Sequence, residues 1–390
     1  PLIILLVGTG IILTLRLGFL QIRLLPYALK LVFTKSKAKD EGDISHFQAL
    51  MTAMAATVGV GNIVGVATAV VSGGPGAIFW MWMAGFFGMA TKYGEAILAV
   101  KYRVKDDKGQ MAGGPMYYLE HGLKQKWLAV LFAIFGAFAA FGIGNGTQAK
   151  AVADAVNNTF TVPFWSTGIA LVLFAGLVII GGIKWIGRVT SFFVPFMALF
   201  YFIAGMFIVI LNFDKVPAAF SLIFTDAFSG QALAGGAIGT VIRFGIARGL
   251  FSNEAGLGSA PIAAAAAKTD IPGRQALVSM TQVLFDTLVI CSITGVSIVM
   301  SGAWQDTSIA AGALTAESWA VFFGSTGSAL ISIGIILFAS STILGWGYYG
   351  EKCFQYLIKN PAAVMGYRIV FVLFIFVGAT ASLDVVWSLA

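Results

Sequence analysis

The sequence predicts an all-α integral membrane protein in which two membrane segments are interrupted, and three observations support this fold class. Of its 390 residues, 58% are hydrophobic and only 11% are charged, whereas soluble domains carry about 25% charged residues. Repeated apolar runs of about 20 residues, with a mean hydropathy of +0.90, are typical of transmembrane helices. Glycines cluster inside one of these runs, MAATVGVGNIVGVATAVVSGGPG, where they loosen a helix.

Ten apolar segments follow one another along the chain, and we expect one transmembrane domain over 1–390. A short stretch, 111–123, is expected to lie at the membrane interface rather than cross it. The connections 212–230 and 302–319 are interpreted as loops, and none of the loops has room for a soluble domain. The ten segments are 1–33, 46–72, 76–103, 126–157, 163–182, 189–212, 231–267, 274–301, 320–350 and 363–388.

Basic residues gather in alternate loops, which predicts the orientation of the chain. Fifteen of the 24 Lys and Arg residues fall on one side, whereas the loops of the other side contain only Lys215. By the positive-inside rule the basic side is cytoplasmic, as in a multi-pass protein of the cell inner (plasma) membrane. The net charge of +7 therefore reflects topology, and we expect a lipid bilayer but no nucleic acid as partner. The cytoplasmic residues are Lys35, Lys37, Lys39, Lys101, Arg103, Lys105, Lys108, Lys124, Lys126, Lys184, Arg188, Lys268, Arg274, Lys352 and Lys359.

The second segment contains Gly59, Gly61 and Gly65 within seven residues. A broken helix in lipid is tolerated only where protein or ligand satisfies its free backbone groups. Close helix packing is the alternative, because Gly61 and Gly65 have the spacing of a small-residue interface. We interpret Gly59 and Gly61 as opening the helix to a ligand and Gly65 as a packing residue.

The seventh segment has a similar interruption, RGLFSNEAGLGSAP at 248–261. Two such segments at matching positions indicate the central site of a transporter. They lie five segments apart and cross in opposite directions, which predicts an inverted five-helix repeat. The first repeat is 46–212, the second is 231–390, and 1–33 is a peripheral helix. The last core helix is missing from this chain and should follow Ala390, and because the chain begins at Pro1 we expect a fragment.

Four blocks closely resemble the sodium:alanine symporter family, also called alanine or glycine:cation symporters. They are GGPGAIFWMWMAGFFGMATKYGE (73–95), AGGPMYY (112–118), RGLFSNEAGLGSAPIAAAAAKTD (248–270) and LGWGYYGEK (344–352), and the resemblance covers essentially the whole chain. The family belongs to the amino acid–polyamine–cation superfamily, with the fold of the bacterial leucine transporter. The resemblance implies a sodium-coupled symporter that imports alanine or glycine by alternating access.

The resemblance also implies how substrate and sodium bind at AATVGVGN, 55–62. In this fold the unwound helix presents N–H groups to the substrate carboxylate and carbonyls to sodium. Carried over, the N–H groups of Val60 and Gly61 bind the carboxylate. Hydroxyls in the ninth segment would otherwise be read as bonding to their own helix backbone. The implied ligands of the co-transported sodium ion are the carbonyls of Ala55 and Val58, the hydroxyls of Ser341 and Thr342, and a carbonyl of Phe338 or Ala339.

The substrate ammonium is expected to meet carbonyls near Leu250, Ser252 and Asn253. A third glycine-loosened stretch, FGIGNGTQAK at 141–150, flanks the central site in this fold. Trp346 is either a pocket residue that limits substrate size or an interfacial tryptophan. The candidate pocket side chains are Thr57, Asn62, Asn145, Gln148, Trp346 and Thr342, the last of which shares a helix face with Trp346.

Charged residues at or near membrane depth are functional by default. Lys92 and Glu95 are three residues apart and can pair on one helix face. Gate pairs that close one side of a pathway and purely structural pairs remain alternatives. The other charged residues at this depth are Arg243, Arg248, Glu254, Asp154 and Asp286.

Other functional classes lack their sequence signals. An intramembrane enzyme needs a base or metal ligands at depth, but His46 and His121 are expected to be ordinary solvated residues at loops. Cys291 and Cys353 make no metal spacing and are interpreted as unpaired apolar residues. A channel needs a continuous pore, and an ATP-driven pump needs a Walker A motif. The choice between alanine and glycine, and between sodium and protons, stays open.

Overall fold

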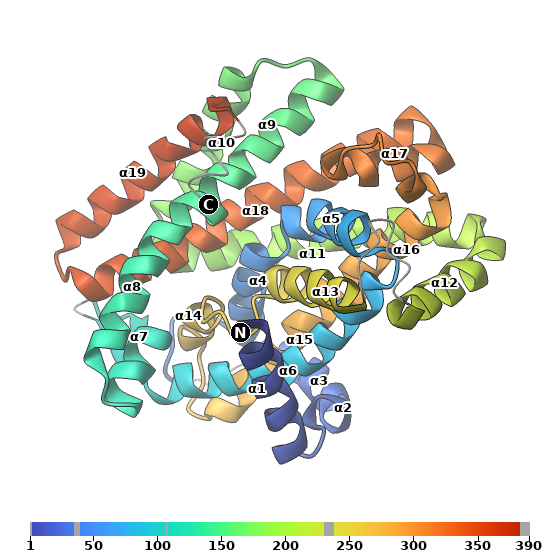
Figure 1. Cartoon of the computed structure of the whole chain (residues 1–390). Coiled ribbons are helices and arrows are strands. Elements are labelled where there is room, and N and C mark those ends of the chain that lie inside the picture. Colours follow the sequence, from blue (N-terminus) through green and yellow to red (C-terminus); the bar gives the residue numbers. More distant parts are fainter. Residues whose placement is uncertain (1, 35–39, 107, 230–237, 383–390) are drawn as a thin grey trace.

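The computed structural model describes residues 2–34, 40–106, 108–229 and 238–382, and these are almost entirely helical (Figure 1). Two short strands, β1 (Val104–Lys105) and β2 (Met111–Ala112), form a small antiparallel hairpin. Three of the predicted cytoplasmic lysines, Lys35, Lys37 and Lys39, lie outside the described residues. So do the first residues of the predicted seventh segment and the last residues of the tenth.

The predicted peripheral helix over 1–33 is wrong as a single element. The chain turns sharply at Gly18 and Phe19, both of which have positive φ values. Glycine adopts this left-handed conformation at little cost, so Gly18 allows the turn. The three resulting helices are α1 (Leu2–Arg16), α2 (Leu20–Arg23) and α3 (Leu25–Val32).

The first predicted repeat is helical over each of its five segments. Its first helix begins with a capping box, in which Ser45 and Gln48 each accept the other's backbone N–H. The helices are α4 (His46–Thr57), η1 (Val60–Asn62), α5 (Val64–Gly73), α6 (Ala77–Lys101), α8 (Lys126–Phe141), η3 (Gly142–Gly146), α9 (Thr147–Phe160), α10 (Phe164–Ile179) and α11 (Gly182–Leu211). Between α6 and α8, the predicted interfacial stretch forms β2, α7 (Pro115–Tyr117) and η2 (Tyr118–Gly122).

The second predicted repeat contains four segments within the described residues. Pro261, Pro272 and Pro361 each stand in the first turn of a helix, where proline costs no hydrogen bond. The helices are α13 (Ile238–Asn253), α14 (Pro261–Ala265), α15 (Pro272–Val283), η5 (Leu284–Cys291), α16 (Ser292–Ser301), α18 (Ser325–Leu357) and α19 (Pro361–Thr380).

Two connections that the sequence predicts as loops contain helices, so those predictions are wrong. The 212–230 connection contains η4 (Phe213–Lys215) and α12 (Val216–Ser229). The 302–319 connection contains η6 (Ala303–Gln305) and the start of α17 (Ala311–Phe323). Both α12 and α17 are too short to cross a bilayer, and α17 packs against α18 and α5 instead.

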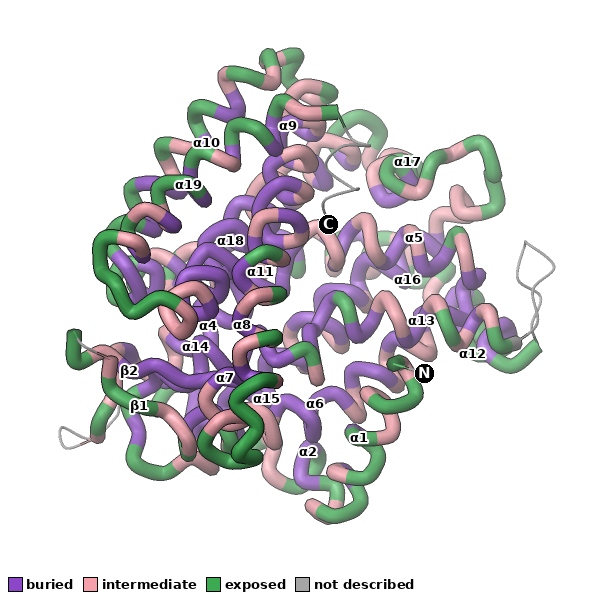
Figure 2. Tube along the Cα trace, turned by 60° about the vertical axis from the view of Figure 1, so that its left-hand side comes forward, coloured by how far each residue is buried: buried purple, intermediate pink, exposed green. Residues whose placement is uncertain are grey.

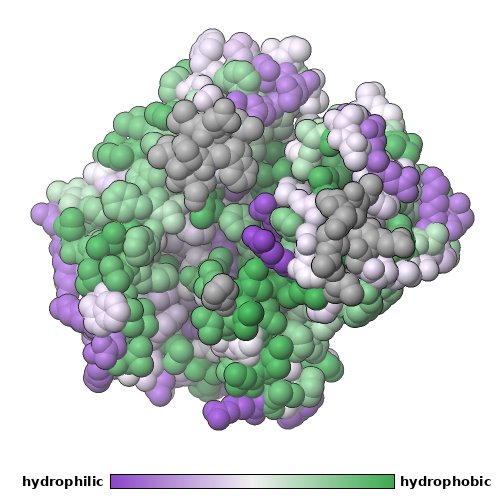
Figure 3. All heavy atoms as spheres, in the orientation of Figure 1, coloured by the Kyte–Doolittle hydropathy of each residue, from purple (hydrophilic) through white to green (hydrophobic). Residues whose placement is uncertain are grey.

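Five helices in the described ranges are long and apolar enough to cross a membrane: Lys126–Phe160, Gly182–Leu211, Pro272–Ser301, Ser325–Leu357 and Pro361–Thr380. The second and seventh predicted segments do not qualify because each is divided into two shorter helices. Apolar residues cover much of the visible face, and polar residues gather mainly toward its edges (Figure 3). Buried residues run along α18, α4 and α6, whereas α10 and α19 contain many exposed residues (Figure 2).

Four segments of the first predicted repeat contact the segments at the matching positions of the second predicted repeat. The helix α6 contacts α15, both α8 and α9 contact α18, and α10 contacts α19. The two interrupted segments also meet, because α5 contacts α13. The breaks are therefore brought together between the two halves.

The guanidinium of Arg103 joins the stretch before α4 to the stretch after α14. It donates to the carbonyls of Ala265 and Ala267 at 2.9 and 2.7 Å, just after α14. It also donates to the carbonyls of Glu41 and Thr269 at 2.9 and 2.7 Å. Next to it, Ile44 and Ala267 form a parallel β-bridge. Four hydrogen bonds from one planar guanidinium thus hold together the stretches before α4 and after α14.

Candidate substrate and ion site

The first interruption lies between Thr57 and Val64 and confirms the predicted break. The chain leaves α4 at Val58, extends at Gly59 and makes one tight turn in η1. The Gly59 N–H donates to Asn62 Oδ1 at 2.9 Å, which satisfies one freed donor. A Cβ atom at Gly59 would collide with Thr342 Oγ1 and lie 3.2 Å from Gln148 Oε1. Glycine is therefore required here by close approach rather than by its φ value.

The other glycines of this cluster have different surroundings. A Cβ atom at Gly61 would meet Phe251 Cδ1 and Ser252 Cα at 3.8 Å, which is ordinary contact. No atom lies within 4 Å of a Cβ placed at Gly65. The interpretation of Gly65 as a packing residue is therefore wrong, because it has open space beside it.

The second interruption runs from Glu254 to Ala260, between α13 and α14. Glu254, Gly256 and Gly258 all have positive φ values, so this stretch is unwound. Glu95 accepts the N–H groups of Gly256 and Gly258 at 3.2 and 2.9 Å. A carboxylate on α6 therefore satisfies two of the freed backbone donors.

Lys92 and Glu95 do not pair with one another, so the predicted pairing is wrong. The Lys92 ammonium donates a hydrogen bond to the Glu254 carbonyl at 3.0 Å, and Glu95 accepts hydrogen bonds from the glycine N–H groups. Both side chains therefore hold the second interruption in place. Glu254 itself accepts from Ser259 and from Trp346 Nε1, the latter at 3.1 Å.

Buried oxygen atoms converge where the first interruption meets α18. Ser341 Oγ lies 2.8 Å from the Phe338 carbonyl, 3.2 Å from that of Ala55 and 3.4 Å from that of Val58. Thr342 Oγ1 lies 3.1 Å from the Phe338 carbonyl and 3.4 Å from that of Val58. We call these five residues the oxygen cluster. Among the described residues, no hydrogen bond joins the Ala339 carbonyl to it.

Gln148 on α9 faces the tight turn of the first interruption. Its Oε1 accepts the Val60 N–H at 3.3 Å, and its Nε2 donates to the Ile143 carbonyl at 3.1 Å. No hydrogen bond from the Gly61 N–H is found within the described part of the chain. Of the two N–H groups predicted to bind the carboxylate, that of Val60 thus donates to a neutral side chain. That of Gly61 has no hydrogen-bond partner among the described residues.

The polar side chains of η1 and α13 form a second group around Asp286. Asn62 and Ser252 both donate to its carboxylate, at 2.7 and 2.9 Å. Asn253 donates to Thr287 Oγ1 at 3.1 Å and accepts the Ala255 N–H. The structure therefore places Asn62, Ser252 and Asn253 around Asp286 and Thr287 of η5. Gln148 instead contacts the turn of the first interruption.

Three predicted pocket residues have other partners. The Leu250 carbonyl accepts the Glu254 N–H at 2.9 Å, so it continues the helix. Thr57 accepts from Gln282 on α15 at 3.0 Å. Asn145 donates to the Phe371 carbonyl of α19 at 2.7 Å, and its Oδ1 is buried without a partner in the described residues. These contacts connect the site to neighbouring helices.

Trp346 lies inside the protein, which excludes the alternative of an interfacial tryptophan. It is buried and its ring packs against Tyr349. A Cβ at Gly144 would overlap the Trp346 side chain, so the π-helical η3 approaches the indole closely. A bulky ring is thus fixed between the second interruption and the third glycine-rich stretch.

The sequence missed three residues of this site. Thr287 and Gln282 contact predicted site residues, and Phe251 faces Gly61. The available signal was the polar run SMTQVLFDT in an otherwise apolar segment. Helix spacing places Gln282 and Asp286 four residues apart on one face.

Other charged and polar residues have structural partners. Asp154 pairs with Lys150 at 2.7 Å on α9, and Arg243 lies over the ring of Phe244. His46 is buried and its Nδ1 lies 2.7 Å from Gln275 Oε1, so the prediction of a solvated residue is wrong for it. The capping turn before α4 places this side chain against α15. Cys291 and Cys353 are buried and free, as predicted.

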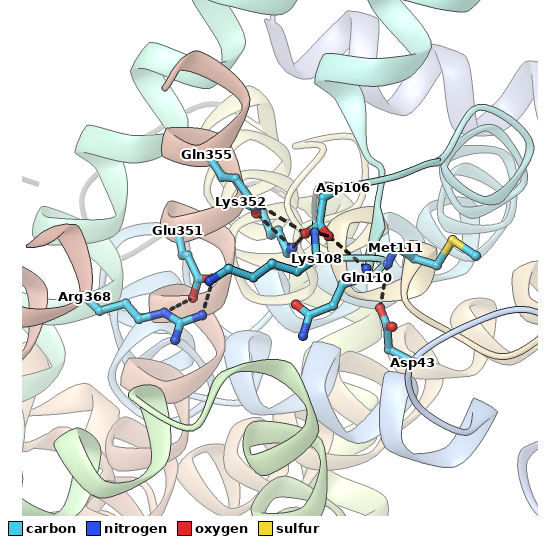
Figure 4. Close-up of polar contacts among 9 residues, drawn as sticks. All are labelled: Asp43, Asp106, Lys108, Gln110, Met111, Glu351, Lys352, Gln355 and Arg368. Atoms are coloured by element: carbon cyan, nitrogen blue, oxygen red, sulfur yellow. Dashed lines mark hydrogen bonds and ion pairs between the residues drawn. The ribbon is translucent and has the colours of Figure 1, made fainter. Parts of the chain in front are cut away.

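A polar network connects β1 with the end of α18, and α18 in turn with α19 (Figure 4). Asp106, beside β1, accepts from Lys352 at 3.3 Å and from Gln355 at 3.1 Å, both near the end of α18. Burial alone would raise the pKa of Asp106, but the Lys352 ammonium and the hydrogen bonds outweigh it and hold the pKa below its ordinary value. Glu351 pairs with Arg368 of α19 at 2.6 Å.

A cavity of about 340 Å³ opens beside this network. Asp106, Glu351 and Arg368 line it together with Tyr356 and Glu120, which share a hydrogen bond of 2.7 Å. Nearby, Asp43 accepts the Met111 N–H at 2.8 Å, and burial raises the pKa of this carboxyl. These contacts tie the hairpin to α18 and to the stretch before α4.

Comparison with known proteins identifies the family. The family model of the sodium:alanine symporters matches residues 1–390. A sodium/alanine symporter of Methanococcus maripaludis is 59% identical over all of this chain and 87% of its own length. A probable sodium/glutamine symporter of Bacillus subtilis is 39% identical over all of this chain and 81% of its own length.

A solved structure supports the fold. The crystal structure of a manganese transporter mutant from Eremococcus coleocola superimposes with a TM-score of 0.57, covering 88% of this chain and 74% of that one at 12% identity. This similarity concerns the fold alone. The interrupted helices, the membrane-length segments and the family match agree, and the chain belongs to the sodium:alanine symporter family of amino-acid transporters.

Proposed function

We propose that the protein imports a small neutral amino acid, alanine or glycine, together with sodium, by alternating access. The observation that carries the proposal is the oxygen cluster, in which Ser341 and Thr342 on α18 meet the carbonyls of Ala55 and Val58 at the first break. Hard cations prefer such oxygen ligands. Each hydroxyl now donates to a carbonyl, and a rotation about its C–O bond would turn its lone pairs toward an ion.

The substrate carboxylate is assigned to the first interruption. The Gly61 N–H is unused, and the Val60 N–H is held only by the neutral oxygen of Gln148. A carboxylate is a stronger acceptor than an amide oxygen, so it would displace Gln148 Oε1. The positive end of the α5 dipole adds to this preference.

Small substrates are favoured by the groups around this position. Phe251 faces Gly61, and Trp346 is held in place by Glu254 and the η3 backbone. We expect the buried Trp346 ring to restrict the length of the substrate side chain at this position. Alanine and glycine therefore fit better than glutamine, the substrate named for one relative.

Alternating access is supported by the packing of the two halves. The contacts α6 with α15, α8 and α9 with α18, and α10 with α19 pair the matching segments of the proposed inverted repeat. We propose that the network at Asp106 closes the cytoplasmic side, and that sodium and substrate binding precede a rocking of the halves. Inward sodium movement supplies about 2.3 kcal/mol per charge per 100 mV.

The proposal is tested by uptake of labelled alanine into liposomes containing the purified protein. An inward sodium gradient should drive accumulation, and replacement of sodium by choline should abolish it. Uptake that is equal in both media would contradict sodium coupling.

Thr342→Ala tests the oxygen cluster itself. We expect the sodium concentration for half-maximal uptake to rise by about tenfold, since a lost hydrogen-bonding group contributes about 1.4 kcal/mol. The matched control is Ser340→Ala, which removes a buried hydroxyl on the same helix that makes no hydrogen bond to α4 in the described residues. An equal effect of both substitutions would place the ion elsewhere.

A further inference from the structure

The cavity of about 340 Å³ beside β1 lies where two membrane-length helices are connected. The helix α18 ends at Leu357 and α19 begins at Pro361, and the lining includes Gln355, Lys359 and Pro361. Helices that span a bilayer end where the hydrocarbon core meets the headgroup layer. We therefore expect the cavity to lie at the depth of the lipid headgroups, on the side predicted to be cytoplasmic.

Most charged residues that line this cavity face an opposite charge of their own. The distances between the charged atoms are 3.3, 2.6, 3.7 and 2.8 Å. These acidic groups therefore have their own partners and leave no free carboxylate to bind a further cation. In the order of these distances, the pairs are Asp106 with Lys352, Glu351 with Arg368, Glu120 with Lys126, and Lys105 with Glu41.

Two lysines in the lining have no such partner. Within the described ranges, neither the Lys108 nor the Lys359 side chain makes a hydrogen bond or an ion pair. The Lys108 side chain extends from the hairpin toward Glu351 and Arg368 (Figure 4), and Lys359 lies in the connection between α18 and α19. Two positive charges on different parts of the fold thus face one cavity without a counter-charge.

Neutral donors and a helix dipole face the same space. The side chains of Gln110, Tyr117 and His121 line the cavity and make no hydrogen bond among the described residues. The N-terminus of the 20-residue α19 also borders it, at Asn360 and Pro361. The Asn360 side chain accepts the first free N–H groups of this helix, so α19 contributes its positive field rather than hydrogen bonds.

We propose that this cavity binds a phosphate group, which Lys108 and Lys359 hold between the hairpin and the α18–α19 connection. Lysine is a common phosphate ligand, and basic pockets between transmembrane helices bind the headgroups of anionic lipids. The phosphate belongs either to a phospholipid headgroup or to a soluble phosphate compound, and both would meet the same side chains. The exposed apolar residues Leu123 and Ile358, close in the chain to His121 and Lys359, favour the lipid.

Lipid retention measures this site directly. Protein purified in a neutral detergent is mixed with phosphatidylglycerol or phosphatidylcholine, and native mass spectrometry counts the lipids that stay bound. We expect the natural sequence to retain one phosphatidylglycerol in preference to phosphatidylcholine. Its affinity should fall about thirtyfold in the double variant Lys108→Gln/Lys359→Gln. Both lysines are exposed and make no polar contact, so this variant should keep its fold.

The matched control is the double variant Lys124→Gln/Lys268→Gln. It removes two exposed lysines of the same predicted side that do not line the cavity, so the net charge changes equally. The control should retain phosphatidylglycerol as the natural sequence does. An equal loss of affinity in both double variants would overturn the site, because a general attraction to the basic side would then explain binding.

Inorganic phosphate distinguishes the two sources. Thermal unfolding is measured in the same detergent, with and without inorganic phosphate. Stabilisation of the natural sequence but not of Lys108→Gln/Lys359→Gln, without preferential retention of phosphatidylglycerol, would identify a soluble phosphate compound. If neither probe distinguishes this variant from the natural sequence, the proposed site is wrong. No transport is measured, so this outcome is separate from that of the sodium symport proposal.

Discussion

Gly59 shows how one residue sets the geometry of the first interruption. The hydroxyl of Thr342 and the amide of Gln148 occupy the space that a side chain would need. The same glycine therefore lets α18 and α9 approach the broken backbone. The neighbouring Gly65 has no such constraint, although it looks equivalent in the sequence.

The different surroundings of Gly59 and Gly65 predict different effects of a glycine-to-alanine substitution at the two positions. Gly59→Ala forces Thr342 away from the Val58 carbonyl, so sodium-dependent alanine uptake should fall by at least about tenfold, as expected for a lost interaction of about 1.4 kcal/mol. Gly65→Ala should leave uptake unchanged and stabilise α5 by up to about 1 kcal/mol, because alanine is the better helix former. Uptake and thermal unfolding of both variants check this pair, and equal losses would show that the collision at Gly59 does not matter.

At the scale of the element, the second interruption depends on side chains from α6. Its positive-φ residues could be predicted as a break from glycine and proline alone. The partners of the break could not be predicted, because the hydrogen bonds that the Gly256 and Gly258 N–H groups donate to Glu95 cross 161 and 163 positions in the chain. Spacing on one helix predicted a Lys92–Glu95 pair. Instead, Lys92 binds a carbonyl and Glu95 binds two N–H groups of the unwound backbone.

Glu95→Gln tests this dependence. The amide has one acceptor oxygen instead of two, so one of the glycine N–H groups loses its partner. We expect the free energy of unfolding to fall by about 1–3 kcal/mol, measured by thermal or denaturant unfolding in detergent. Glu317→Gln, at an exposed position on α17, is the matched control and should change stability by less than about 0.5 kcal/mol. A neutral Glu95→Gln would mean that water or other groups satisfy the glycines.

The short helices α12 and α17 explain why element prediction failed at two loops. Hydropathy detects segments of about 20 apolar residues, whereas these helices are 14 and 13 residues long and contain Asp226 or Glu317. Their helical state depends on packing against α16 and α18, which no local pattern reveals. The break at Gly18 and Phe19 lies inside a stretch that we interpreted as one apolar segment, although Arg16, Gln21 and Arg23 flank it.

At the scale of the whole molecule, segment order and the meeting of the two interruptions could be predicted from sequence. The matched glycine-rich stretches predicted which two segments are interrupted. The family resemblance implied that Ser341 and Thr342 face the first of them. Long-range polar contacts were not predictable, because hydrophobic patterns do not specify which buried polar groups meet. Asp286 with Asn62 and Ser252 is the clearest example.

The contacts of Asp106 predict how the stability of the fold depends on pH. Because the pKa of Asp106 is lowered from 3.8, its contacts with Lys352 and Gln355 stabilise the fold above that value. This contribution is lost as the pH falls through the lower pKa of the folded state. Asp106→Asn should thus reduce stability by about 1–3 kcal/mol between pH 5 and 8, and the difference should shrink as the pH falls below 3.8.

Thermal unfolding of both proteins across this pH range measures the effect. The control is Asp214→Asn, an exposed residue that makes no hydrogen bond within the described ranges, and its stability should follow the natural sequence. A difference that persists unchanged at pH 3 would assign the contribution to shape rather than charge.

Arg103 limits the ways in which this transporter can change shape. Its single guanidinium spans the carbonyl of Glu41, ahead of α4, and those of Ala265, Ala267 and Thr269, after α14. These two ends therefore share their degrees of freedom and travel as one rigid body. We therefore expect relative motion within each divided segment to occur at the breaks, so that the proposed ligand-binding stretches would also act as hinges.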